Sequence, residues 1–501
     1  MGKLRSMQKA PFPWRAIIMG ALLSVLVALY SSYAGLKVGG VYWPMVTTAV
    51  VSLAIMRLIG GKDRNEANVM QTAASTGGLL AAGIIFTIPA IFMLGLQVSA
   101  TDILLVSLTG GLLGLLFVYP LRQRMVVEEK LPYADGAAAA SIISAGDKGG
   151  KQSKVLLGSF GAGAVFAVAN TALMLPLSLI SIAGGFLIGT RFTLAWFAGA
   201  IATLFLVAPF FGEGLAQPLG VGIVIGAAVA YFLVAGIPVF LKVAQYYHKA
   251  RMGKWGGIAI LLLCLVLVYA FDLSLPLALL AAAGAFLMAF IGARITGEMN
   301  VDPMEIFALI VLLAAKFLFG FGVLHLVLLA AVVCIAAGIA GDAMQDFKTG
   351  FLLGTPPEHQ LAAEAAGVIT ASLVMGILML SFAGVGFGTP EFPAPQAIAV
   401  KEIVQSGSLS TALLAGAAIG FLFTLAAWKM KLGAVAIAFG IGLYVPFSLS
   451  LLLFIGGLAR HFIDKAKQTE KWRLVAGGVI AGEGLVGAII VLAAAAKFLG
   501  I

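Results

Sequence analysis

Long apolar runs separated by short polar segments fill almost the whole chain. A bilayer core about 30 Å thick needs about 20 apolar residues per helix. Runs of about this length stand at residues 16–35, 41–60, 69–96, 101–120, 155–180, 193–211, 256–272, 275–293, 304–320, 322–341, 361–383, 408–428 and 474–499. The pattern predicts an all-α polytopic membrane protein with about 13–17 membrane segments.

Two further apolar stretches, 213–242 and 432–462, are too long for one span and too short for two spans with a turn. Both lie between basic segments that we expect on the cytoplasmic side, so each should cross the membrane an even number of times. We therefore predict two hairpins of shortened helices, the first broken around Gly226–Gly236 and stopped by Pro238, the second broken at Pro446. The alternative is that both stretches are continuous tilted helices in which the prolines are kinks.

An internal repeat divides the chain. The pattern Ile59-Gly60 followed by Glu66-x-Asn68-Val69 recurs at constant spacing as Ile291-Gly292 followed by Glu298-x-Asn300-Val301, and Gly220-Val-Gly222-Ile recurs as Gly440-Ile-Gly442-Leu. This order predicts two homologous halves, residues 1–250 and 251–501. With the spans counted above, both halves have the same orientation in the membrane and the repeat is parallel. If one span is miscounted, the repeat is inverted. Duplicated halves with interrupted helices are typical of secondary transporters, whose binding site lies at the repeat interface.

Composition agrees with a membrane protein. Of the 501 residues 61% are hydrophobic and 10% are charged, whereas soluble domains carry about 25% charge. The formal net charge of +10 arises from basic residues in short segments beside apolar runs, which is how cytoplasmic loops appear. We expect a lipid bilayer and not nucleic acid as the partner, with a cytoplasmic N-terminus and a location in the cell (inner) membrane.

Polar side chains within apolar runs are costly and therefore candidates for function. At the start of the 69–96 run they recur at helical spacing on one face, where they either contact substrate or join helices by hydrogen bonds. The candidate substrate-binding residues are Asn68, Gln71, Thr72, Ser75, Tyr133, Asn300, Gln345 and Tyr444. Tyr444 stands beside the predicted break at Pro446, where its ring and hydroxyl could both be used.

Acidic residues are the candidates for proton coupling. The set is Asp135, Glu298, Asp342, Asp346 and Glu483. Each has a structural alternative: Asp135 could cap a helix, acids around Pro303 could begin one, and the polar run 342–351 could be a cytoplasmic loop. Glu66 and Glu298 are repeat equivalents that should face one region from two sides. Glu483 lies between glycines in the last span, where we expect no packing role, so we favour coupling.

Several motifs are missing from the sequence. It has no Walker A pattern, HExxH or CxxC, which disfavours ATP-driven transport and metal-dependent hydrolysis within this chain. We expect no cofactor and no resident metal. The leading hypothesis is a secondary transporter that moves a small molecule together with protons. A polytopic membrane enzyme and a passive channel are the alternatives, and the oligomeric state stays open, a homo-oligomer included.

At these polar positions the chain resembles the OPT family, the oligopeptide transporters that include the yellow-stripe-like metal-chelate transporters. The resemblance rests on residues 68–94, 131–146, 341–360, 440–464 and 474–487, and the QTxAS and MQDFKTG stretches are specific. It implies about 16 membrane segments and a cation-coupled, usually proton-driven symporter of short peptides, glutathione-like compounds or metal chelates. The chain is short and lacks the NPG and KIPPR signatures of the fungal and plant peptide branch, so it resembles the prokaryotic branch.

Overall fold

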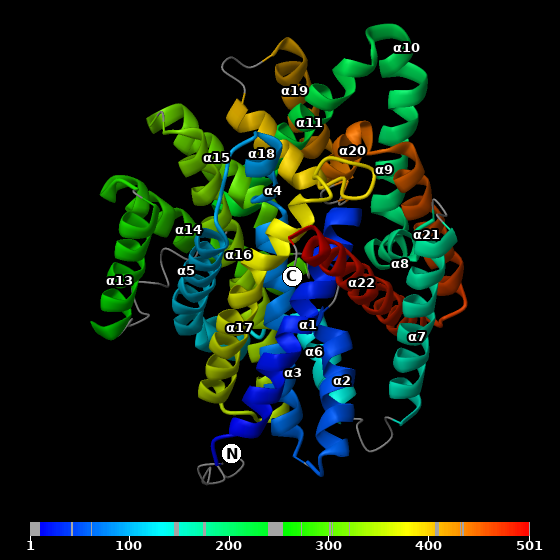
Figure 1. Cartoon of the computed structure of the whole chain (residues 1–501). Helices are drawn as coiled ribbons and strands as arrows, with labels where there is room; N and C mark the ends of the chain where they lie inside the picture. Colours follow the sequence, from blue (N-terminus) through cyan, green and yellow to red (C-terminus); the bar gives the residue numbers. More distant parts are fainter. Residues whose placement is uncertain are drawn as a thin grey trace.

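The computed structural model describes residues 11–499 apart from 42–43, 62, 145–149, 174–176, 239–253, 272, 300–301, 303, 320, 406–409, 431 and 433–434. All regular secondary structure in this part of the chain is helical, as predicted. The helices form one bundle, with the N-terminal residues at one end and the C-terminal helix packed along its side (Figure 1).

Twelve helices of the described residues are long and apolar enough to cross a membrane, and four shorter helices are also apolar. The long ones contain α1 (Trp14–Val38), α3 (Arg64–Ile85), α5 (Ala100–Val118), α7 (Gly150–Leu173), α9 (Thr190–Ala202), α11 (Ala216–Tyr231), α14 (Leu275–Met299), α16 (Val323–Leu353), α17 (Pro357–Ala383), α19 (Thr411–Lys429), α21 (Phe447–Lys465) and α22 (Thr469–Leu499). The shorter ones, not all of them apolar, are α2 (Pro44–Leu58), α4 (Pro89–Met93), α6 (Ala134–Ser144), α8 (Leu179–Ile188), α10 (Ala208–Phe211), α13 (Lys254–Phe271), α15 (Met304–Phe319), α18 (Pro395–Gln405) and α20 (Val435–Tyr444). Four of the long spans continue beyond the labelled helix: α3 through α4 to Met93, α5 to Leu121, α9 through α10 to Phe211, and α11 to Gly236.

The predicted spans match these helices with two informative differences. The run 155–180 is not one span, because α7 ends at Leu173 and the separate short helix α8 follows. The run 322–341 is longer than predicted, because α16 continues to Leu353 and ends at Gly354, whose φ of +81° suits glycine. The polar run 342–351 is therefore a buried part of a helix, and its interpretation as a cytoplasmic loop is wrong.

The structure has a helix break in only one of the two stretches for which hairpins are predicted. The second stretch is broken at Pro446 between α20 and α21, as predicted. In the first stretch, α11 continues without a break through a π-helical turn at Phe232–Gly236, so the hairpin prediction is wrong there. The even number of crossings was required only because 155–180 was counted as a single span. The two stretches do approach each other, since a Cβ on Gly220 would lie 2.6 Å from the carbonyl oxygen of Gly440.

Helix α16 forms the centre of the bundle (Figure 1). Every residue from Leu326 to Gly350 is buried, and α3, α5, α6, α14, α15 and α17 pack around it. A helix that is apolar around its whole circumference belongs in a core. The polar residues at its C-terminal end are therefore enclosed by protein.

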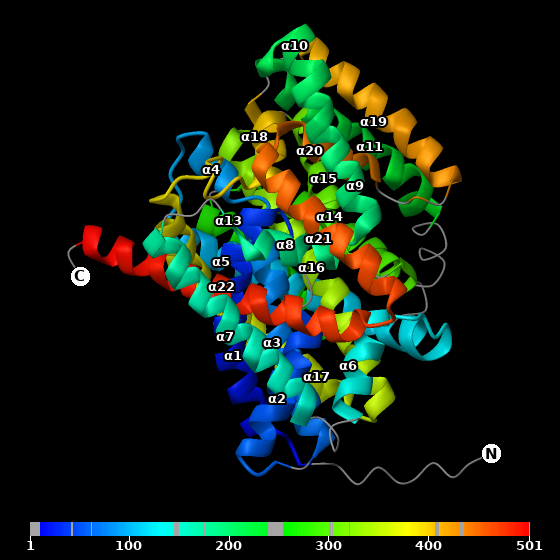
Figure 2. The ribbon, with the colours of Figure 1, turned by 90° about the vertical axis from the view of Figure 1, so that its right-hand side faces the viewer.

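Glycines bring the helices into close contact. On α11 and α19, which lie side by side in Figures 1 and 2, the pairs Gly222/Gly226 and Gly416/Gly420 have small-xxx-small spacing. A Cβ on Gly226 would overlap the carbonyl oxygen of Ala417, and one on Gly420 would overlap that of Ile223. Because lipid gives no hydrophobic drive between helices, such backbone contact supplies much of the attraction.

We predict that Gly226→Ala lowers the apparent unfolding temperature of the protein in detergent micelles. Its methyl group would force α11 and α19 apart, and overpacking of this kind costs about 1–3 kcal/mol. Gly158→Ala on α7 is the control, because a Cβ there meets no atom within 4 Å. Equal unfolding temperatures for the two variants would contradict the proposed contact.

Candidate functional site

A cavity of about 630 Å³ opens between the two halves of the chain. Its wall includes residues of the α1–α2 connection, α8, α9, α11, α16 and α20. Aromatic side chains line part of it, namely Phe86, Phe192, Trp196 and Tyr231. The volume falls within the range of small-molecule sites, about 300–1,000 Å³.

Charged side chains of both signs line the cavity. The acids are Asp135, Asp302, Glu305 and Asp342, and the bases are Arg191, Arg460 and Arg473. Both carboxylate oxygens of Asp302 are buried, and no side chain of the described residues donates a hydrogen bond to them. Asp302 also packs tightly on α16, where a Cβ on Gly341 would overlap its Oδ2 atom. The acids come from α6, from α16 and from the region around the start of α15, whereas the arginines come from α9, α21 and α22.

Behind this wall lie three buried carboxylates, which we call the acid cluster: Asp342, Asp346 and Glu364. Asp342 is 5% exposed and the other two are fully buried. One carboxylate oxygen from each lies within 4.8 Å of the others, a spacing that could hold a metal ion. Asp342 belongs both to the acid cluster and to the cavity wall. The cluster is therefore directly connected with the cavity.

Helix α3 supplies hydrogen-bond donors to the acid cluster. Gln71 Nε2 donates to Asp346 Oδ1 at 2.6 Å, and Ser75 Oγ donates to Asp346 Oδ2 at 2.9 Å. Thr76 Oγ1 donates to Glu364 Oε2 at 2.7 Å. Three carboxylates this close cannot all carry a negative charge in a low-dielectric interior, so protons or a metal cation must compensate them.

The rest of the predicted α3 face continues this network. Thr72 accepts a hydrogen bond from Gln360 Nε2 at 3.5 Å, and Asn68 Nδ2 donates to Thr355 Oγ1 at 3.1 Å. The face thus meets α16 and α17 and does not line the cavity directly. Its hydrogen bonds join helices, while its role in substrate binding stays a prediction.

The two family-like stretches 131–146 and 341–360 contact each other. Gln345 Oε1 accepts from the backbone N–H of Gly136, Lys348 Nζ donates to the carbonyl oxygen of Leu131, and Thr349 Oγ1 donates to that of Gly136, each at 2.8 Å. These bonds fix the start of α6, and Asp135 at that position lines the cavity.

Two of the candidate tyrosines lie outside the cavity lining. Tyr133 is fully buried, and its hydroxyl donates to the carbonyl oxygen of Ala293 at 3.0 Å. The hydroxyl of Tyr444 donates to the carbonyl oxygen of Pro395 at 3.0 Å, which ties the end of α20 to α18. Asn300 lies outside the described residues. A role of these residues in binding stays a prediction.

The repeat glutamates occupy different positions on their helices. Glu66 pairs with Arg15 at 2.9 Å in the first turn of α3, whereas Glu298 is exposed near the end of α14 and pairs with Arg294 at 2.9 Å. The expectation that they face one region stays a prediction.

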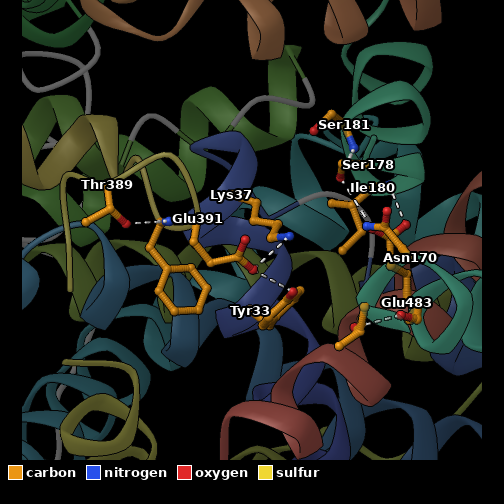
Figure 3. Close-up of polar contacts among 12 residues, drawn as sticks. Tyr33, Lys37, Asn170, Ser178, Ile180, Ser181, Thr389, Glu391 and Glu483 are labelled. Carbon is orange, nitrogen blue, oxygen red and sulfur yellow. Dashed lines mark hydrogen bonds and ion pairs between the residues drawn. The ribbon is translucent and has the colours of Figure 1, made fainter. Parts of the chain in front are cut away.

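Glu483 has a packing role that sequence reasoning missed. Its carboxylate accepts hydrogen bonds from the backbone N–H of Ile180 at 2.9 Å and from Ser178 Oγ at 3.4 Å, at the start of α8 (Figure 3). An acid at a helix N-terminus satisfies free N–H groups. The argument that Glu483 lacks a structural reason is therefore wrong, while its part in coupling stays a prediction. Nearby, Tyr33 and Lys37 both contact Glu391 in a separate group (Figure 3).

Several site residues were absent from the sequence-based set. They are Thr76, Gln360 and Glu364 at the acid cluster, and Arg191, Asp302, Glu305, Arg460 and Arg473 at the cavity. Gln360 and Glu364 are four residues apart within the apolar helix α17, the same spacing as Gln71 and Ser75. This four-residue spacing of polar residues within an apolar helix could have identified Gln360 and Glu364 as candidates from the sequence.

Long apolar helices around an internal polar cavity define the class of integral membrane proteins to which secondary transporters belong. The sequence model described as OPT oligopeptide transporter protein matches this chain over residues 12–252 and 251–494. The chain therefore belongs to the OPT oligopeptide transporter family, in two repeated halves. This is a family of transporters, so the membrane-enzyme alternative is excluded. The predicted boundary between residues 250 and 251 lies outside the described residues and stays a prediction.

Relatives of known name cover the chain to different extents. A Haemophilus influenzae protein named as an oligopeptide transporter is 27% identical over 590 aligned positions, which cover 93% of each chain. A rice protein named as the metal-nicotianamine transporter YSL14 is 32% identical over 171 positions, or 29% of this chain and 23% of the relative. A Saccharomyces cerevisiae protein named as an oligopeptide transporter is 25% identical over 46% of this chain and 36% of its own.

We predict that Gln71→Leu lowers the apparent unfolding temperature in detergent. The change removes the amide donor to Asp346 and leaves a buried carboxylate oxygen with one bond fewer, at a cost of about 1–3 kcal/mol. Gln123→Leu is the control, because Gln123 is exposed. If the variants unfold at the same temperature, the hydrogen bond does not contribute to stability.

Proposed function

We propose that this protein is a proton-coupled symporter that takes a small peptide, a peptide-like compound or a metal chelate across the cytoplasmic membrane. The observation that supports this most is the continuity of cavity and acid cluster through Asp342. A solute site and a cation site that share a side chain can influence each other's occupancy. That mutual influence is what coupling requires.

The charges of the cavity favour a substrate with groups of both signs. A peptide has an ammonium group at one end and a carboxylate at the other. Acids such as Asp302 and Asp342 can attract the ammonium group or a chelated metal, and Arg191 or Arg460 can attract a carboxylate. The names of the relatives support the same two substrate kinds, oligopeptides and metal chelates.

Protons are the coupling ion that we propose. Of the five predicted acids, Asp135 and Asp342 line the cavity, and Asp346 lies behind it. As candidates for proton coupling, Asp135, Asp342 and Asp346 are therefore better supported than Glu298, which is exposed and ion-paired. The cytoplasmic N-terminus also remains part of this proposal, supported by the basic segments at 57–64 and 122–130.

We predict concentrative, gradient-dependent uptake by the purified protein in proteoliposomes. With an inward proton gradient and no sodium gradient, labelled short peptides or metal chelates from a panel should accumulate above the external concentration. A protonophore should abolish the accumulation and leave only equilibration, because the driving force is lost.

Accumulation that survives the protonophore would contradict proton coupling. Equilibration without accumulation in both conditions would favour a passive channel. Liposomes without protein control for leak.

A further inference from the structure

The acid cluster and the side chains that contact it come from three helices in the same way. Each contributes a pair of polar residues four positions apart, on one face and one turn from each other. The pairs are Gln71 and Ser75 on α3, Asp342 and Asp346 on α16, and Gln360 and Glu364 on α17. We propose that the acid cluster forms a binding site for one hard metal cation, coordinated by oxygen atoms only.

The spacing of the carboxylates fits a single ion. Hard cations such as Ca²⁺ bind oxygen at about 2.3–2.6 Å, so two ligands on opposite sides of the ion are up to about 5 Å apart. One carboxylate oxygen from each of Asp342, Asp346 and Glu364 lies within 4.8 Å of the other two. One cation between them can therefore contact all three with small side-chain adjustments.

Unpartnered oxygen atoms are the second, independent observation. Within the described residues, Gln71 Oε1 belongs to a fully buried side chain and accepts no hydrogen bond. Asp342 Oδ2 and Glu364 Oε1 are also buried and receive no hydrogen bond from an N–H or hydroxyl donor there. Buried polar atoms of this kind are rare in folded proteins, and a cation bound between the carboxylates would compensate them.

Helices α3 and α17 place their amides differently. Gln71 Nε2 bonds to the Asp346 carboxylate, whereas Gln360 Nε2 bonds to the Asp346 backbone oxygen and Gln360 Oε1 lies against Gly350. Gln71 Nε2 and the hydroxyls of Ser75 and Thr76 donate to the carboxylates of the acid cluster. Three donors for six carboxylate oxygens leave acceptors in excess, which suits a cation.

Charge compensation is also lacking within the part of the chain that the structure describes. No lysine or arginine there forms an ion pair with the acid cluster. Lys348, on the same helix, donates instead to the carbonyl oxygen of Leu131. The ligand set contains carboxylate and amide oxygens and neither thiolate nor imidazole, which selects hard cations over zinc or copper.

The place of this ion in transport rests on the proposed function. Because Asp342 also lines the cavity, an ion in the cluster would fix the orientation of one wall residue and hold α3, α16 and α17 together. Binding of the ion itself is independent of transport and can be measured without it.

The test uses the purified full-length protein in detergent, freed of metal by a chelator. Thermal unfolding is followed against rising concentrations of Ca²⁺, Mg²⁺, Mn²⁺ and Na⁺ chlorides, with choline chloride as the ionic-strength control. We expect at least one cation to raise the unfolding temperature with single-site saturation, because a ligand that binds only the folded state stabilises it. The cation that does so identifies the ion.

Glu364→Gln and Asp342→Asn should weaken this binding at least about tenfold, since even the loss of an outer-shell partner can cost that much. Glu358→Gln is the matched control, being an exposed glutamate at the start of the same helix α17. Its affinity should equal that of the unchanged protein. Mn²⁺ binding by electron paramagnetic resonance provides a readout that does not depend on unfolding.

Absence of a response to all four cations would overturn the inference and leave the cluster as protonated carboxyl groups. So would a response that persists in both cluster variants. Failure of gradient-driven uptake alongside saturable cation binding would instead reject proton coupling and leave the metal site intact.

Discussion

Enclosing three carboxylates at the centre of a membrane protein is the constraint on which this structure depends. An acid in the bilayer core costs about 2.5–3.5 kcal/mol on insertion scales, and neighbouring acids repel each other. The chain meets this cost by surrounding the acid cluster with protein. Helix α16 lies at the centre of the bundle, and α3 turns its polar face toward the cluster.

The geometry of the cavity follows from the same helix. The C-terminal part of α16 presents Asp342 to the cavity and, one turn further, holds the start of α6 through Gln345 and Thr349. Close glycine contacts make this arrangement possible, as where Gly136 lies against the backbone of Gln345. The proposed solute and cation sites therefore share one helix, through which a change in one could reach the other.

Sequence reasoning found the parts of the site that interrupt an apolar pattern. Gln71 and Ser75 on α3 stand out because they open an apolar run, and Asp342 and Asp346 on α16 stand out because they directly follow one. Glu364 was missed, since only tertiary packing brings α17 against α16. The packing role of Glu483 was also missed from the sequence. Its carboxylate accepts a hydrogen bond from the backbone N–H of Ile180, and the sequence analysis did not predict that a short helix, α8, begins at this point.

The fold was predictable in class and less so in topology. Apolar runs located nearly every long helix, and the break at Pro446 followed from proline chemistry. The prediction of a hairpin at 213–242 is wrong. The positive-inside rule indicates only whether a stretch crosses the membrane an odd or an even number of times, and the rest of the prediction depended on the span count. That count treated 155–180 as one span, whereas the structure has two helices there, α7 and α8.

The central claim is that Asp342 links the solute cavity to the proposed cation site. The most direct test compares two activities of one variant, exchange of substrate across the membrane and accumulation of substrate against its gradient. Proteoliposomes with the Asp342→Asn variant would be measured for substrate counterflow without a gradient and for concentrative uptake with one. We expect counterflow to persist while accumulation is lost, whereas Glu358→Gln, at an exposed position at the start of α17, keeps both. Normal accumulation by Asp342→Asn would contradict the account.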